Sequence, residues 1–176
     1  MDWDDLGASF SEELPDSIGN LEMEELDLSF CDFTGSIPSS LGSLTKITFL
    51  HLKFNNFEGQ IPDVFGNFKK LIKLDFSFNN FHGLLPSSAF NNLLTNEEQF
   101  PRKTFQTIDL RSNSLQGPLP TPPQTIHHLF ISENELTVEI PSGFCNITFP
   151  QVLNLSKNNL SGIIPKCLGN YDFVSV

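Results

Sequence analysis

Three residues that could perform acid-base chemistry recur in this sequence of 176 residues at a constant interval. Asp27, His51 and Asp75 are evenly spaced, and each stands in the middle of a triplet whose outer residues are apolar. Carboxylates on both sides of an imidazole favour its protonated form and can share a cation with it. The series therefore raises two chemical hypotheses, a catalytic site and a metal site.

A third hypothesis treats the same residues as one row on a repeat surface. Side chains alternate along a strand, so the outer residues of each triplet face a core and the middle residue faces solvent. Neighbouring strands lie about 4.8 Å apart, which aligns the middle residues across one face. The row reads Asp27, His51, Asp75, Asp109, Phe130 and Asn154. We favour a polar ligand-contact face, because no activated nucleophile, oxyanion site or enclosed pocket accompanies it. We expect no enzyme activity, metal or cofactor.

The triplets belong to a unit that repeats along nearly the whole chain. The triplet at 26–28 recurs at 50–52 and 74–76, and three further copies are centred on Ile108, Leu129 and Leu153. A tail follows each triplet and carries Asn, then an apolar residue, Gly and Pro, with occasional replacements. One unit cannot bury its apolar face alone, whereas stacked units share a continuous core and about three suffice. Six units therefore predict a stable stack.

The tail has structural roles of its own. Its Asn turns the chain, and the side-chain amide can satisfy backbone groups of neighbouring turns. Its Gly supplies a permissive backbone position, and the Ile-Pro step keeps the next segment extended. Cys31 replaces the first Asn and is predicted to be a buried structural thiol. We assign Phe33, Phe57 and Phe81 to the core.

The residue before each Asn position forms a second row. It reads Phe30, Phe54, Phe78, Ser112, Glu133 and Lys157. Three aligned aromatic residues on an exposed rim indicate a protein contact, although the rings can instead pack against one another. We add the neighbouring Lys53 and Arg111 to the candidate ligand-contact surface.

Charge is concentrated at the N-terminal end of the chain. The net charge is −11, and the segment 1–32 holds eleven of the 21 Asp and Glu but no Lys or Arg. An acidic surface without a basic stripe disfavours nucleic-acid binding. The sequence as written has no apolar stretch long enough for a membrane span and no secretion-signal pattern after Met1, so we expect neither.

The spacing of the units divides the chain. We expect a degenerate partial repeat over 1–20, three regular repeats over 21–93, three more over 105–170, and the start of another over 171–176. The step from Phe76 to Leu110 is longer than the regular step from Leu52 to Phe76. Residues 94–104 are therefore either a loop that bulges from the stack or the scar of lost units. The fifth unit should be irregular, because Val138 stands where Gly is usual.

Several smaller features complete the set of candidate sites. Cys145 and Cys167 fall on adjacent units, either as a disulfide in an oxidising compartment or as two buried small apolar side chains. His127 and His128 are adjacent in a strand and point to opposite faces, so they cannot chelate one ion together. Glycosylation sequons begin at Asn146, Asn154 and Asn159 and apply only if the chain is secreted.

The repeat unit resembles the plant-specific class of leucine-rich repeat. The runs at 110–120, 140–146 and 158–170 are similar to the ectodomains of plant receptor-like proteins of the disease-resistance type. The resemblance implies an α/β-type repeat solenoid, with a parallel concave β-sheet and a convex side of irregular, 3-10 or short-strand segments. It also implies a plasma-membrane receptor without a kinase of its own, which binds a peptide or protein ligand extracellularly and signals in defence or development through a partner receptor kinase.

This chain departs from that plan at both ends. We expect no signal peptide, cysteine-rich N-terminal cap, membrane helix or cytoplasmic tail in the sequence as written, so any membrane attachment would come from missing parts of a full-length receptor. Two alternatives therefore stay open: a secreted inhibitor of a microbial cell-wall enzyme, which can use the same repeat, and a non-functional receptor remnant.

Overall fold

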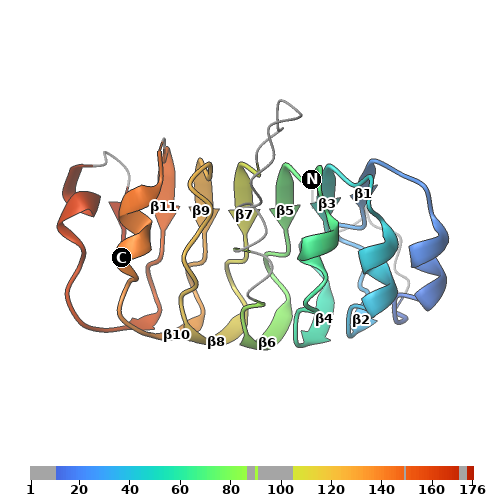
Figure 1. Ribbon diagram of the computed structural model, residues 1–176. Coiled ribbons are helices and arrows are strands. Elements are labelled where there is room, and N and C mark those ends of the chain that lie inside the picture. Colours follow the sequence, from blue (N-terminus) through green and yellow to red (C-terminus); the bar gives the residue numbers. More distant parts are fainter. Residues whose placement is uncertain (1–10, 87–89, 91–104, 149, 171–173) are drawn as a thin grey trace, which may run out of the picture.

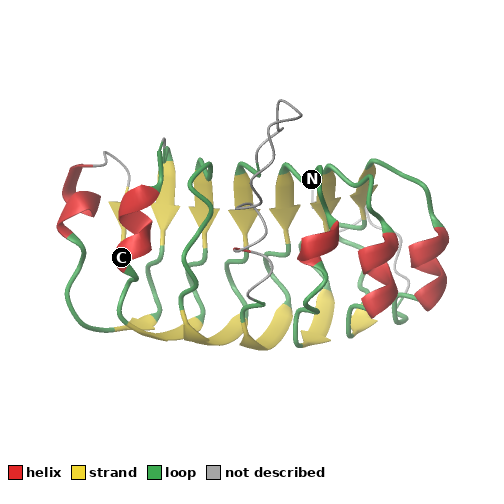
Figure 2. Cartoon of the chain, in the orientation of Figure 1, coloured by secondary structure: helices red, strands yellow, loops and turns green. Residues whose placement is uncertain are grey.

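The computed structural model describes residues 11–86, 90, 105–148, 150–170 and 174–176. They form a stack of coils with two rows of short parallel strands and 3-10 turns between them (Figure 1; Figure 2). The first row is a seven-stranded sheet, made of β1 (Glu25–Asp27), β3 (Phe49–His51), β5 (Lys73–Asp75), β7 (Thr107–Asp109), β9 (His128–Phe130), β11 (Val152–Asn154) and β13 (Val174–Ser175). This arrangement confirms the predicted repeat solenoid.

We call the seven-stranded sheet the inner sheet. A second, outer sheet is formed by the segments that follow the turns at the ends of the inner strands. Its six strands are β2 (Thr34–Gly35), β4 (Asn56–Gly59), β6 (Asn80–Leu84), β8 (Ser114–Pro118), β10 (Glu135–Val138) and β12 (Asn159–Leu160). The 3-10 turns on the convex side are η2 (Asp16–Asn20), η3 (Ser39–Ser43), η4 (Phe65–Asn67), η5 (Ser142–Asn146) and η6 (Lys166–Asn170). Each coil therefore runs through an inner strand, a sharp turn, an outer strand and a convex return.

The register of the inner sheet follows the repeat. Leu50 of β3 lies opposite Leu26 on one side and Leu74 on the other, and all three are buried. The sheet continues across the long interval, because Asp75 of β5 pairs directly with Asp109 of β7. Residues 94–104, predicted to be a loop or a scar, lie outside the described residues.

Phenylalanine fills the core of the first units. Phe33, Phe57 and Phe81 are buried, and their rings stack with centroids 5.8 and 6.0 Å apart. Leu115 and Leu136 occupy the same position in later units and are fully buried. The prediction that these aromatic residues belong to the core is confirmed.

A ladder of asparagine side chains closes the end of each inner strand. Asn134 donates hydrogen bonds from Nδ2 to the carbonyl oxygens of Leu110, Ile131 and Ser132, at 3.0, 3.2 and 3.2 Å. Its Oδ1 accepts the backbone N–H of Leu115 at 3.0 Å. The same pattern recurs at Asn55, Asn79, Asn113 and Asn158. One side chain thus joins neighbouring coils through their backbones.

Cys31 stands at the first position of this ladder. Its backbone N–H donates to Asn55 Oδ1 at 3.1 Å, and its thiol donates to the carbonyl of Ser29 at 3.3 Å. The side chain is half-buried, so the prediction of a buried thiol was wrong in degree. A thiol cannot donate the two hydrogen bonds of an asparagine amide. The coil of Cys31 is joined to the next coil through the side chain of Asn55 instead.

The turn into the convex side requires a left-handed residue. Gly35, Gly59, Gly83, Gly117 and Gly162 have φ angles between 70° and 84°. Val138 occupies the same position with a φ of 72°, a conformation that a β-branched residue rarely adopts. The fifth unit therefore has the same backbone turn as the other units. Its predicted irregularity is the strain of placing a valine at this left-handed position.

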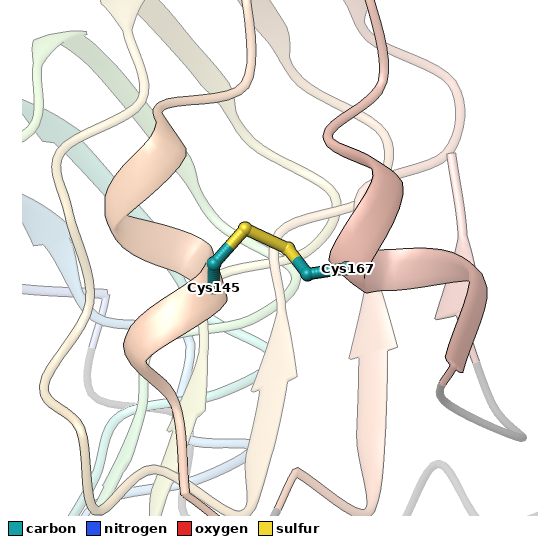
Figure 3. The surroundings of a disulfide bond; sticks show 2 residues. All are labelled: Cys145 and Cys167. Atoms are coloured by element: carbon teal, nitrogen blue, oxygen red, sulfur yellow. A yellow bond between two sulfur atoms is a disulfide. The ribbon is translucent and has the colours of Figure 1, made fainter.

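A disulfide links the last two convex turns. Cys145 of η5 and Cys167 of η6 are bonded, with Cα atoms 5.6 Å apart (Figure 3). The two residues are 22 positions apart, so the bond fastens one whole coil to the next. Of the two alternatives that the sequence left open, the structure has the disulfide.

We expect Asn134→Ala to lower the free energy of unfolding by at least about 3 kcal/mol, because each buried polar group left without a partner costs about 1–3 kcal/mol. Denaturant unfolding followed by circular dichroism measures the change. Asn159→Ala, at an exposed asparagine, is the control and should stay within about 0.5 kcal/mol of the wild type. Equal effects of the two substitutions would contradict the role of the ladder.

We expect Val138→Gly to stabilise the fold by about 0.5–1 kcal/mol, because relief of the left-handed strain exceeds the entropy cost of glycine. The reverse change is available at Gly59, where a Cβ would meet only Ser36 at 3.5 Å. Gly59→Val should therefore destabilise the fold by about 0.5–1 kcal/mol, because the left-handed strain is partly offset by the lower conformational entropy of the unfolded chain. A loss of stability in Val138→Gly would show that the valine side chain makes a contact that outweighs its strain.

Candidate functional site

The first candidate row lies across the inner sheet, as its register requires. Asp27, His51, Asp75, Asp109, Phe130 and Asn154 are successive partners on neighbouring strands. Asp27 is exposed, and its Oδ2 lies 3.5 Å from Nδ1 of His51. Burial acts to raise the pKa of Asp27, but hydrogen bonds from Ser29 and the charge of His51 hold this pKa below its usual value.

The centre of this row differs from the expected solvent-facing ladder. Asp75 and Asp109 are only 5% and 4% exposed. Ser77 Oγ donates to Asp75 Oδ1 at 2.6 Å, and an Arg111 terminal nitrogen lies 2.8 Å from Asp109 Oδ2. The expectation of free surface carboxylates was wrong here, because the side chains two positions further along the chain pair with them and cover them.

Burial and the neighbouring Asp75 affect the pKa of Asp109. The pKa of Asp109 is raised, first by burial and then by the neighbouring charge of Asp75, while Arg111 acts in the opposite direction. Among the described residues, no three His, Cys, Asp or Glu side chains gather as metal ligands would. Asp109 thus works as an internal support for Arg111, whereas Asp75 is held by Ser77.

Arg111 is held in place by aromatic rings as well as by its ion pair. Its guanidinium carbon lies 5.7 Å from the centroid of Phe78 and 5.1 Å from that of Phe130. Lys53 is placed in a similar way, with Nζ 5.5 Å from the centroid of Phe30. Both cations are therefore oriented beside the second candidate row.

The second row begins with a stack of three exposed rings, which we name the aromatic row. Phe30, Phe54 and Phe78 are 51%, 41% and 36% exposed. Neighbouring rings are almost parallel, with centroids 4.6 and 4.2 Å apart. The rings pack against one another and still remain partly open to solvent, so packing does not remove the exposed apolar surface.

All residues of the second row have left-handed backbones. The φ angles of Phe30, Phe54 and Phe78 are 59°, 53° and 55°, and Ser112, Glu133 and Lys157 match them. In the later units the row becomes polar, with Ser112 donating to Glu133 Oε2 at 2.6 Å and Lys157 forming an ion pair with Glu133. The rim therefore has an aromatic half and a polar half.

An open groove of about 710 Å³ lies beside the aromatic row. Phe78 lines it together with residues of β2, β4 and β6. Sequence reasoning missed this groove, although its signal was present: polar residues follow the ladder asparagines in consecutive units, as Asn56 and Asn80 do.

The remaining candidates are the two adjacent histidines and the three glycosylation sequons. The rings of His127 and His128 are perpendicular, and His128 Nδ1 lies 3.3 Å from Thr107 Oγ1. Asn146 and Asn159 are exposed, whereas half-buried Asn154 accepts hydrogen bonds from the backbone and hydroxyl of Ser156. Glycosylation of these residues stays a prediction.

The Leucine Rich Repeat family model matches residues 22–44, 46–68, 70–96, 125–147 and 150–171. The unit between the third and fourth matches has the same architecture in the structure, with β7 and β8 in register with their neighbours. Among the described residues, no helix has the length and apolar character needed to cross a membrane.

Similar curated proteins come from Arabidopsis thaliana. Receptor-like protein 6 is 48% identical over 61 residues, which cover 35% of this chain and 6% of that protein. Receptor-like protein 7 is 38% identical over 68 residues, which cover 39% of this chain and 7% of that protein. The chain thus matches only a small part of the length of each relative.

Solved structures with the same fold include peptide receptors. The plant peptide hormone receptor RGFR1, in complex with RGF2, matches with a TM-score of 0.82 and 32% identity over 93% of this chain and 25% of that chain. The Arabidopsis receptor kinase HAESA, in complex with the peptide hormone IDA and the co-receptor SERK1, matches with a TM-score of 0.80 and 29% identity over 92% of this chain and 26% of that chain.

The family model covers more than half of the sequence, and the coil that it describes is the coil seen in the structure. The chain belongs to the leucine-rich repeat family, as a non-enzymatic repeat scaffold related to plant receptor-like proteins and to the ectodomains of peptide-hormone receptors.

Proposed function

We propose that this chain recognises a peptide or protein ligand as part of a plant cell-surface receptor-like protein, in defence or developmental signalling. The ligand contacts the recognition face, which we define as the row Asp27, His51, Asp75, Asp109, Phe130 and Asn154, the aromatic row, Lys53 and Arg111. The observation that carries the proposal is the aromatic row, three consecutive rings that stack on one another and still remain partly exposed on the rim.

Physical reasons favour the aromatic row as a contact. Clustered apolar groups left in water commonly mark an interaction site, and aromatic residues are enriched among the residues that dominate binding energy. Stacking fixes the rings before a ligand arrives, so little side-chain entropy is lost on binding. Lys53 and Arg111, oriented over Phe30 and Phe78, add charged groups at the same place.

The relatives support the same function. RGFR1 and HAESA are solved with peptide hormones, and HAESA also with the co-receptor SERK1. By extension, this chain works on the extracellular side of the plasma membrane and signals through a partner receptor kinase. The similarity to receptor-like proteins 6 and 7 supports the receptor assignment.

We expect Phe54→Ala to weaken ligand binding about tenfold or more while leaving the fold intact, because a central interface aromatic contributes about 1–2 kcal/mol or more. Phe54 stacks on two rings, so the loss of stacking should cost about 1–3 kcal/mol of stability. The probe is a peptide selected on the immobilised wild-type chain from a random display library, with affinities measured by calorimetry.

Leu84→Ala is the matched control, because Leu84 is 61% exposed and lies on the second sheet, outside the recognition face. It should leave the affinity unchanged. Unfolding of the Phe54→Ala variant, or equal affinity of the two variants for the selected peptide, would refute the role of the aromatic row.

A further inference from the structure

The groove beside the aromatic row is lined by two kinds of residue. Phe78 and Ser112 belong to the second row, and the others include residues of β2, β4 and β6. Asn55 and Asn79 of the ladder also line it, and their amides already bind backbone groups. The lining residues come from five successive coils, from Glu13 to Ser112, which span about 19 Å at the strand spacing, so an extended segment of about four residues, roughly 14 Å long, fits within the groove.

The residues of β4 and β6 that line the groove present polar side chains that are available to a ligand. Asn56 and Glu58 are two residues apart in β4 and so point to the same face, and Asn80 of β6 is the register partner of Glu58. All three are exposed, and none of their side chains has a hydrogen-bond partner within the described part of the chain. Carboxamides can both donate to and accept from a peptide backbone.

The charge of the groove has one sign. Glu13 and Glu58 are the charged residues that line it, and neither Lys nor Arg does within the described part of the chain. The nearest cations of the recognition face are already engaged, Lys53 over Phe30 and Arg111 with Asp109. Eight acidic residues between positions 11 and 32 are all exposed, so the surrounding field also attracts positive charge.

We propose that this groove binds an extended, basic peptide segment of about four residues. Its Lys or Arg side chains pair with Glu13 and Glu58, its backbone hydrogen-bonds to Asn56 and Asn80, and an apolar side chain packs against the exposed part of Phe78. The proposal rests on the proposed recognition function and adds the chemical class of the ligand.

The test compares three blocked tetrapeptides, acetylated and amidated, by calorimetry on the full chain. Leu-Lys-Leu-Lys should bind at least about tenfold more tightly than Leu-Glu-Leu-Glu, because like charges oppose the second peptide. Ser-Lys-Ser-Lys should bind more weakly than Leu-Lys-Leu-Lys, because it lacks an apolar side chain to pack against Phe78. Added salt should weaken the binding of Leu-Lys-Leu-Lys.

Charge-neutralising variants locate the binding. Glu13→Gln with Glu58→Gln should lower the affinity for Leu-Lys-Leu-Lys about threefold to tenfold, the range for two exposed ion pairs. Glu135→Gln removes one such charge from β10 of the same sheet, outside the groove, and should leave the affinity unchanged. Circular dichroism confirms that each variant is folded.

Failure to bind the basic peptide, equal affinity for the acidic one, or equal effects of the double variant and Glu135→Gln would each overturn the groove assignment. The proposed recognition function fails separately, if the display-selected peptide binds wild type and Phe54→Ala with the same affinity. The two failures are therefore distinguishable.

Discussion

The end of each inner strand is the point on which the rest of the molecule depends. There the chain turns sharply, and the carbonyl groups at the turn need hydrogen-bond donors that the next strand does not supply. One asparagine per coil provides them, and its oxygen accepts an amide of the neighbouring outer strand, as Asn134 does for Leu115. Buried polar groups are tolerated only when they are satisfied, so this side chain is required in almost every coil.

The same turn determines what the surface can display. The residue before each ladder position is forced into a left-handed backbone, and its side chain leaves the stack at the rim. The position does not dictate side-chain type, since Phe30, Ser112 and Lys157 all occupy it with nearly the same φ angle. A structural constraint thus creates a regular series of outward sites, on which this chain carries an aromatic row followed by a polar one.

The repeat made the fold and the membership of each row predictable. The repeated triplet and tail fix which side chains align, even where the interval between units changes, so the core phenylalanines and the order of the inner-sheet row followed from the pattern. Burial within a row was not predictable, because it depends on neighbouring side chains. Asp75 and Asp109 are covered through Ser77 and Arg111, whose conformations no pattern specifies. The groove also escaped prediction, because it forms between the rim and the second sheet.

The central claim is that this scaffold binds its ligand on the recognition face and the adjoining groove. Hydrogen–deuterium exchange with and without a display-selected peptide tests it most directly, because protection reports contact along the backbone. We expect protection in β3, β5 and β7, in β4 and β6 along the groove, and in the turns that carry Phe54 and Phe78. Protection confined to the convex turns η3, η4 and η5, with the inner strands unchanged, would contradict the claim.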